Sequence, residues 1–195
     1  MKKILMMTVA MLALVFAACG SKTTKNQPAE TAGNTDSAKN PEVLVAYFSA
    51  SGVTAGVAKQ LAEVTGGDLH QIQPEQPYTD ADLDWRDKQS RSTLEMQDKS
   101  SRPAIINKLD SISNYDVIYV GFPIWWGTAP TIVNTFMESY DFSSKTVVLF
   151  ATSGGSGIEQ ADREFKEAYP NVNWKEGKLL NGMSKQDLEE WVKGF

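Results

Sequence analysis

The chain has 195 residues, of which 42% are hydrophobic and 22% are charged, and its formal net charge at pH 7 is −5. An acidic balance without a basic run argues against binding to nucleic acid and against electrostatic adsorption to anionic lipid. The single cysteine is at position 19. The residues that follow it therefore form no internal disulfide, bind no cysteine-ligated metal and perform no thiol redox chemistry.

The N-terminus has the pattern of an export signal. Lys2 and Lys3 precede an apolar stretch, residues 4–16, that is too short for an ordinary membrane-spanning helix. The sequence Phe16-Ala-Ala-Cys19 resembles the lipobox of bacterial lipoproteins, so we expect a signal peptide over residues 1–18 and lipidation of Cys19. A secretory signal with an incidental Cys19 is the alternative.

The segment that follows, residues 19–41, is rich in polar residues, alanine and proline and has no apolar cluster. This composition predicts a disordered tether. With a lipid on Cys19, the protein would be exported and anchored to a membrane of the cell envelope, on the periplasmic side. The remaining residues, 42–195, have the size of one domain with a core of its own.

A strand, a loop and a helix begin this domain. Residues 43–48 are continuously apolar, as in a central parallel strand that is covered on both faces. The first loop, residues 49–54, contains three hydroxyl side chains and a glycine. After it, apolar residues recur at helical spacing until Gly66 and Gly67 end the helix.

The first loop has the composition of a phosphate site. The N-terminus of the following helix leaves backbone N–H groups unpaired, and hydroxyl donors stand beside them. The loop contains no lysine, and neither G-x-x-x-x-G-K-[ST] nor G-x-G-x-x-G is present, which disfavours a nucleoside-triphosphate loop. The alternative is a simple turn in which Ser51 caps the helix.

Residues 76–102 form a long polar segment, called the 76–102 segment below. Residues 84–98 within it are charged nearly all round, which predicts a surface helix. Segments of this length are often functional lids or disordered. Tyr78 and Trp85 either line a site or pin the segment to the body of the domain, and we favour pinning.

Strands and helices alternate five times along the domain. This alternation predicts an α/β fold in three layers, a doubly wound parallel sheet with helices on both faces. After the first helix we expect an edge strand at residues 68–74, a helix at 104–110 and a buried strand at 115–122. A helix that begins near Pro130 and a buried strand at 146–152 should follow. The chain should end with a helix at 159–169, a short strand from 172 to 174, and a closing helix with a capping box at Ser184 and Asp187.

Three loops of unusual composition follow the most apolar strands: the first loop, the second loop at residues 123–127 and the third loop at residues 152–157. In open parallel sheets, ligands bind outside the carboxyl ends of the strands. Of the two indoles in the second loop, we expect one to pack in the core and Trp126 to cover a flat apolar ligand. The glycine-rich third loop permits positive φ and close approach to a ring's polar edge.

Other chemistries find little support. Ile158 stands where the last glycine of G-x-S-x-G after Ser156 would be, and His70 lies at a different strand, so a serine hydrolase triad is disfavoured. His70 is expected on the polar face of the edge strand, without a function. No H-x-x-H or paired acidic motif indicates a metal site.

These motifs together resemble the flavodoxin family, specifically the branch with P-I-W-W-G-x-x-P after the third strand. The resemblance covers residues 43–195 and implies a five-stranded sheet in the order 2-1-3-4-5, non-covalent FMN and electron transfer. Carried over by position, the three loops would each bind one part of FMN. The phosphate would be held by Ser49, Ala50, Ser51, Gly52, Val53 and Thr54. The ring would be covered by Pro123, Ile124, Trp125, Trp126 and Gly127, and its pyrimidine edge would be approached by Thr152, Ser153, Gly154, Gly155, Ser156 and Gly157. Ser51 stands where the family more often has threonine, and the 76–102 segment is longer than in a short flavodoxin.

Three functions follow as hypotheses. The first is a membrane-tethered FMN protein that transfers electrons to a redox partner protein or a small-molecule acceptor. The second is an FMN-dependent oxidoreductase that acts on a small substrate such as a quinone, with the 76–102 segment in its pocket. The third is a binding module that retains the fold without the cofactor.

Overall fold

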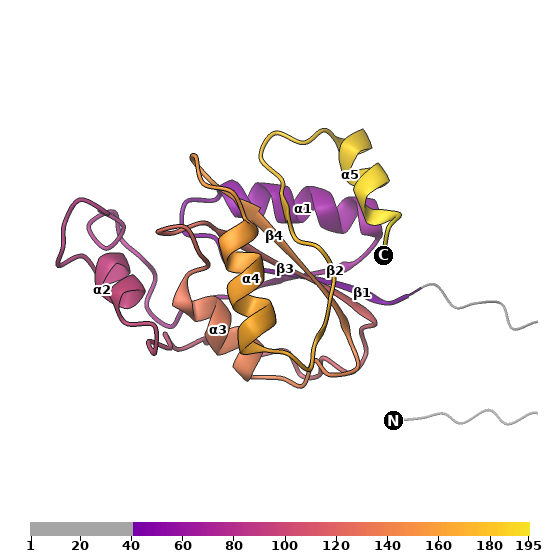
Figure 1. Cartoon of the computed structure of the whole chain (residues 1–195), viewed down its shortest axis with the longest axis horizontal. Helices are drawn as coiled ribbons and strands as arrows, with labels where there is room; N and C mark the ends of the chain where they lie inside the picture. Colours follow the sequence, from indigo (N-terminus) through magenta and orange to yellow (C-terminus); the bar gives the residue numbers. More distant parts are fainter. Residues whose placement is uncertain (1–40) are drawn as a thin grey trace, which may run out of the picture. The chain divides into compact units, whose positions relative to one another are not determined.

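A parallel β-sheet forms the centre of the computed structural model, which describes residues 41–195 (Figure 1). The strand order is β2-β1-β3-β4-β5, as the resemblance implied, and every strand pair is parallel. The predicted signal peptide (1–18), the lipidation site Cys19 and nearly all of the tether (19–41) lie outside the described residues. The strands are β1 (Val43–Tyr47), β2 (Asp68–Gln71), β3 (Val117–Pro123), β4 (Thr146–Thr152), β5 (Asn173–Trp174) and β6 (Lys178–Leu179).

The last position in the sheet is occupied by two short strands rather than one. β5 pairs with the start of β4, where Asn173 lies opposite Thr146, and β6 pairs near its end, where Leu179 lies opposite Ala151. The sequence predicted β5 and missed β6. Because β6 continues the ladder along β4, it carries the chain toward the carboxyl edge of the sheet.

Helices cover both faces of the sheet (Figure 1). The core on one face includes residues of α1 (Val53–Thr65) and α5 (Lys185–Val192), and the core on the other includes residues of α3 (Thr131–Glu138) and α4 (Glu159–Ala168). Successive residues of a strand point to opposite faces. Leu44 therefore joins the α3/α4 core and Val45 the α1/α5 core. This two-sided burial explains why β1 reads as a continuous apolar run.

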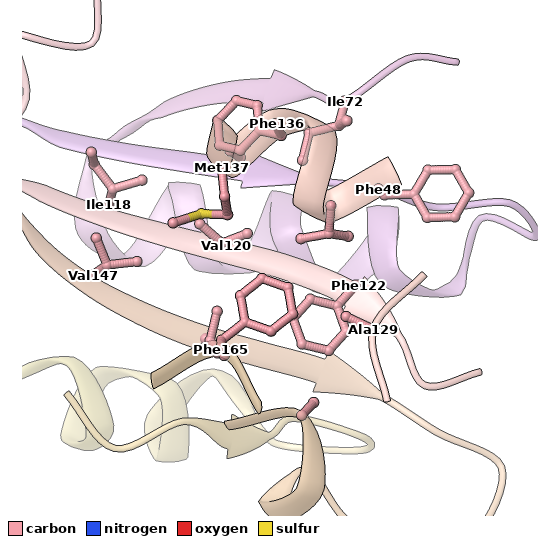
Figure 2. Packing of buried hydrophobic residues seen from close by; sticks show 14 of the residues in the cluster. Phe48, Ile72, Ile118, Val120, Phe122, Ala129, Phe136, Met137, Val147 and Phe165 are labelled. Carbon is pink, nitrogen blue, oxygen red and sulfur yellow. The ribbon is translucent and has the colours of Figure 1, made fainter. Parts of the chain in front are cut away.

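The α3/α4 core is rich in aromatic rings (Figure 2). Phe122 of β3 and Phe165 of α4 stack with ring centroids 6.0 Å apart. Phe48, which follows β1, is fully buried in the same core. Phe48 and Phe122 lie near the carboxyl ends of their strands, so the core supports the edge of the sheet from which the candidate loops emerge.

Two helix boundaries agree with the sequence signals. Helix α1 ends at Gly66, whose φ of 67° is the left-handed conformation that glycine adopts at low cost. Helix α5 begins with the predicted capping box, in which Ser184 and Asp187 each accept a hydrogen bond from the other's backbone N–H. These local signals predicted the ends of the two helices correctly.

Two predicted helices need correction. The surface helix within residues 84–98 is confined to α2 (Arg91–Gln97), because Ser90 caps its N-terminus and the residues before it form turns. The helix expected at 104–110 is absent. There the backbone of Ile105 forms an antiparallel bridge with Pro74, and the N–H of Ile106 donates to the carbonyl of Gln73 (3.1 Å). Pairing with the chain after β2 holds this segment extended.

The predicted position of His70 on a polar face was wrong. His70 shares a strand face with Ile72, which is fully buried, and its ring stacks on Phe136 at 6.1 Å. Among the described residues, its buried Nε2 has no hydrogen-bond partner. Burial lowers the pKa of His70, against a smaller opposing effect of a hydrogen bond to the backbone of Asn107.

We expect the domain to lose stability as the pH falls below the normal pKa of histidine. The unfolded chain then binds a proton that the folded chain resists, so the free energy of unfolding decreases. Because His70 is the only histidine, His70→Gln should flatten this dependence. Urea unfolding of both proteins at pH 7.5 and 5.5 measures it, and equal pH dependence in the two proteins would contradict the assignment.

Candidate functional site

The three predicted loops emerge from one edge of the sheet, after β1, β3 and β4. Two interactions tie residues of the three loops together. The Oγ1 atoms of Thr54 and Thr152 are 2.8 Å apart in a buried hydrogen bond, and the N–H of Ile124 donates to the carbonyl of Thr152 (2.8 Å). These contacts hold the three loops next to one another at this edge of the sheet.

The first loop is folded by its own residues and leaves the helix N-terminus uncapped. The N–H of Gly52 donates to Ser49 Oγ (3.1 Å), and Gly52 has a φ of 87°. Gly52 occupies the N-cap position of α1, and no side chain accepts from the first turn. The alternative in which Ser51 caps the helix is therefore wrong. The amides of the first turn remain available for an anion.

Thr54 differs from the other hydroxyls of the first loop because it is buried. Its side chain and that of Thr152 are both nearly inaccessible, and each is the other's partner. A hydroxyl that accepts a hydrogen bond still has its own hydrogen to donate. The pair therefore fixes α1 against β4 and leaves at most one O–H for a ligand.

The second loop contains a two-residue turn. Trp125 and Thr128 exchange backbone hydrogen bonds of 2.9 and 3.0 Å, and between them Trp126 and Gly127 have φ values of 47° and 85°. Positive φ at both central residues is the requirement of a type I′ turn. It is expected for glycine but costs free energy for a residue as large as tryptophan. The turn therefore carries backbone strain at Trp126.

One of the two indoles packs against the core, as predicted. Trp125 packs inward, with its ring edge-on to Phe48 (5.6 Å) and to Tyr78 (5.4 Å). Trp126 has 49% of its surface exposed. An exposed indole beside a cavity offers a flat apolar face to a ligand.

The third loop is fixed by a residue that sequence reasoning did not identify. The side-chain amide of Asn181 accepts from the N–H of Ser153 (2.7 Å) and donates to its carbonyl (2.9 Å), while Ser153 Oγ accepts from the N–H groups of Gly155 and Ser156. The glycines of this loop permit positive φ but do not adopt it, because a side-chain turn at Ser153 shapes the loop instead.

A cavity of about 440 Å³ lies between the first loop, the second loop and the 76–102 segment. The third loop contributes no residue to its lining, so the structure brings two of the three predicted loops into one cavity. None of the residues that line it is charged. The lining residues are Ala50, Ser51, Leu83, Trp85, Ser92, Pro123, Ile124, Trp125 and Trp126.

The two aromatic residues of the 76–102 segment have different roles. Tyr78 pins the segment to the body, as favoured, because its ring packs against Phe48 and Trp125. Trp85 is 68% exposed and lines the cavity, so its expected pinning role was wrong. The sequence could not separate the two, because both are aromatic residues in polar surroundings.

Polar contacts fold the 76–102 segment on itself and tie its far end to α3. The Tyr78 hydroxyl donates to Glu95, and burial together with this carboxylate raises the pKa of Tyr78. The Arg91 guanidinium binds Glu95 (2.7 Å) and lies over the Tyr78 ring at 4.0 Å. At the far end, Arg102 forms two 2.8 Å hydrogen bonds with Glu138 of α3 and lowers the pKa of that carboxyl.

Neither a metal site nor a membrane-spanning helix is found in the described part of the chain. Within residues 41–195, no three His, Cys, Asp or Glu side chains gather as metal ligands would. In the same residues, no helix combines the length and the apolar composition that a bilayer crossing requires.

Comparison with known proteins identifies relatives of this chain. The flavodoxin family model matches residues 42–195. A Bacteroides eggerthii protein provisionally named a flavoprotein is 52% identical, with a TM-score of 0.78 over 80% of this chain and 98% of that one. A second such protein, from Bacteroides uniformis, is 55% identical, with a TM-score of 0.77 over 80% and 99% of the two chains. A Lactobacillus acidophilus flavoprotein, solved in complex with FMN, is 23% identical, with a TM-score of 0.61 over 78% and 99%. The curated proteins contain no match.

Proposed function

We propose that this protein, which belongs to the flavodoxin family, binds FMN in the cavity and transfers electrons through it. The observation that supports this most directly is the cavity itself. It joins a loop suited to an anion with a wall of indoles suited to a flat ring, and it is lined by residues from two loops that the family resemblance assigned to the cofactor.

The first loop fits the phosphate. Ser51 lines the cavity, and the uncapped first turn of α1 presents backbone N–H groups at the positive end of the helix dipole. The loop carries no charged side chain, so binding would rest on hydrogen bonds from amides and hydroxyls. Ser49 supports the loop from within by accepting from Gly52.

The remaining lining fits a flat heteroaromatic ring. Seven of its nine residues are Ala, Leu, Trp, Pro or Ile, and pockets for planar cofactors are predominantly apolar with a few placed polar groups. When bound, FMN would supply the one- and two-electron chemistry. The protein would exclude water from the ring, hold it against the indoles and set its potential.

The lining also predicts the direction in which the protein shifts the potential. It contains no lysine or arginine to stabilise the negative charge that reduction places on a bound ring. An apolar, cation-free surrounding disfavours that charge and would lower the potential of the anionic reduced couple. This property suits a low-potential electron donor.

The location of the proposed electron carrier follows from the N-terminal pattern. Lipidation of Cys19 would anchor the domain to a membrane of the cell envelope, since several acyl chains give a stable anchor. The tether would let the domain move between a membrane reductase and an acceptor, either a redox partner protein or a small molecule.

Purification and FMN titration test the proposal. We expect the purified protein to carry a flavin with perturbed visible bands, to release FMN on denaturation, and to bind added FMN as the apoprotein. The absence of flavin as isolated, together with no binding of added FMN, would favour a cofactor-free binding module and would contradict the proposal.

An FMN-dependent oxidoreductase is the second candidate. Leu83 and Trp85 of the 76–102 segment form a wall of the cavity, as an enzyme with a substrate pocket would need. Steady turnover of a quinone by the purified holoprotein with a nicotinamide donor, without a partner protein, would favour this candidate over the electron carrier.

A further inference from the structure

One buried polar atom of a residue that lines the cavity has no hydrogen-bond partner in the described part of the chain. Ser92, in the first turn of α2, lines the cavity and is only 2% exposed. Its Oγ is buried and forms no hydrogen bond within residues 41–195. A hydroxyl removed from water without a partner is destabilising. Such an atom beside a cavity points to a ligand.

Among the hydroxyls at the start of α2, those of Ser90 and Thr93 have partners and that of Ser92 has none among the described residues. The Ser90 hydroxyl donates to Thr93 Oγ1 (2.8 Å) and caps the helix. The N–H of Ser92 donates to the carbonyl of Asp82 (3.0 Å), which fixes the backbone at this point. Serines within helices commonly bond to the carbonyl four residues earlier, but Ser92 lies in the first turn and makes no such bond. The backbone of Ser92 is thus held in place, and its hydroxyl is left without a partner within these residues.

The composition of the cavity indicates which part of a ligand Ser92 would meet. Only two of its lining residues carry a hydroxyl, Ser51 and Ser92. Ser51 belongs to the first loop, beside the uncapped helix. The third loop, expected to meet the polar edge of the ring, does not line the cavity. Ser92 is then the remaining hydroxyl for that edge; its Oγ is shielded from solvent in this structure, so it would reach the ligand by rotation about χ1.

We propose that the Ser92 hydroxyl forms a hydrogen bond with the polar edge of the flavin ring, so that the 76–102 segment completes the cofactor site. This inference rests on the proposed function, because it takes FMN as the ligand of the cavity. Ser92 would act as a binding residue, and the anchoring of the segment through the Tyr78 ring and Arg102 would keep it in position.

The test uses Ser92→Ala in the purified protein. Loss of one hydrogen bond to the ring should raise the Kd for FMN by about five- to tenfold. The visible flavin bands of the mutant holoprotein should shift, because they report the surroundings of the ring. The apoprotein should be as stable as the wild type or more stable, because an unsatisfied buried hydroxyl has been removed.

Two variants serve as controls. Ser101→Ala makes the same chemical change in the same segment, outside the cavity, and should leave the Kd and the bands unchanged. Ser51→Ala should raise the Kd without shifting the bands, since Ser51 is assigned to the phosphate. Ser92→Cys, similar in size and a weaker donor, should give an intermediate Kd.

The outcomes separate this inference from the proposed function. If the wild type binds no FMN, the proposed function fails and the inference fails with it. If the wild type binds FMN and Ser92→Ala has the same Kd and the same bands, only the inference is overturned. If Ser92→Ala and Ser92→Cys lose apoprotein stability together with affinity, Ser92 has a structural role and the inference is likewise overturned.

Discussion

Replacing Gly121 with alanine should destabilise the domain by about 3 kcal/mol, the upper part of the range for overpacked cores. Gly121 is a buried residue of β3 and lies opposite Phe150 of β4. A Cβ at this position would lie 2.0 Å from Cζ of the Phe150 ring and 2.4 Å from Cε2. Phe150 is fully buried, so its ring cannot move away without disturbing the α1/α5 core.

A matched substitution elsewhere should act in the opposite direction. In α1, a Cβ at Gly56 would have no heavy atom within 4 Å, and the residue does not have positive φ. Gly56→Ala should therefore stabilise the protein by about 0.5–1 kcal/mol, through helix propensity and a less flexible unfolded chain. Thermal or urea unfolding measures both variants.

A second substitution should partly rescue Gly121→Ala. Phe150→Leu shortens the side chain that the new methyl group would strike, so the double mutant should lose less than the sum of the two single mutants. Strict additivity would show that the contact with Phe150 is not the cause. Because β3 leads directly into the second loop, the packing of these two strands also fixes the position of that loop and its two tryptophans.

The sheet could be predicted because its main strands are recognisable from the sequence as apolar runs. β1 and β4 are continuous apolar runs, and burial on both faces requires such runs. The bounds of β4 agree with the predicted 146–152 at both ends. β6 could not be found in this way. It has only two residues, and pairing with the end of β4 holds it in the sheet rather than any pattern of its own.

The middle of the chain shows where local patterns fail. The spacing of residues 104–110 permits a helix, but pairing of Ile105 with Pro74 holds them extended. Likewise, the alternation of residues 68–74 suggested a solvent-facing His70, whereas the tertiary fold places that face against Phe136. In both cases a contact between distant residues overrides a weak local preference.

The candidate site was predictable where it depends on strand ends and not where it depends on side-chain contacts. The first and second loops could be located because they follow recognisable strands. Asn181 and Ser92 could not, since an asparagine after a two-residue strand and a serine in a polar segment are ordinary by composition. Their positions depend on hydrogen bonds and burial that only the folded chain reveals.

Trp126 is the residue whose loss should weaken FMN binding most. Trp126→Gly removes an indole that is half exposed at the cavity. Loss of a stacked aromatic face should cost about 2 kcal/mol of binding free energy, a roughly 30-fold rise in Kd. Fluorescence titration of the apoprotein with FMN measures this change, since a bound flavin in contact with an indole is quenched.

The same substitution should make the apoprotein more stable. Trp126 has a φ of 47°, which glycine adopts without the steric cost that tryptophan carries. Stability and affinity should therefore change in opposite directions, as expected where backbone strain is maintained for a binding role. Trp126→Phe keeps a flat apolar ring and should retain most of the affinity.

A control separates this effect from a general loss of exposed apolar surface. Ile106 is 54% exposed and does not line the cavity, so Ile106→Ala should leave the Kd for FMN unchanged. If Trp126→Gly bound FMN as tightly as the wild type, the second loop would not cover the ring and its positive φ would need another explanation. If affinity and stability fell together, the indole would instead hold the turn in place, and the strained conformation would be a feature of folding rather than of binding.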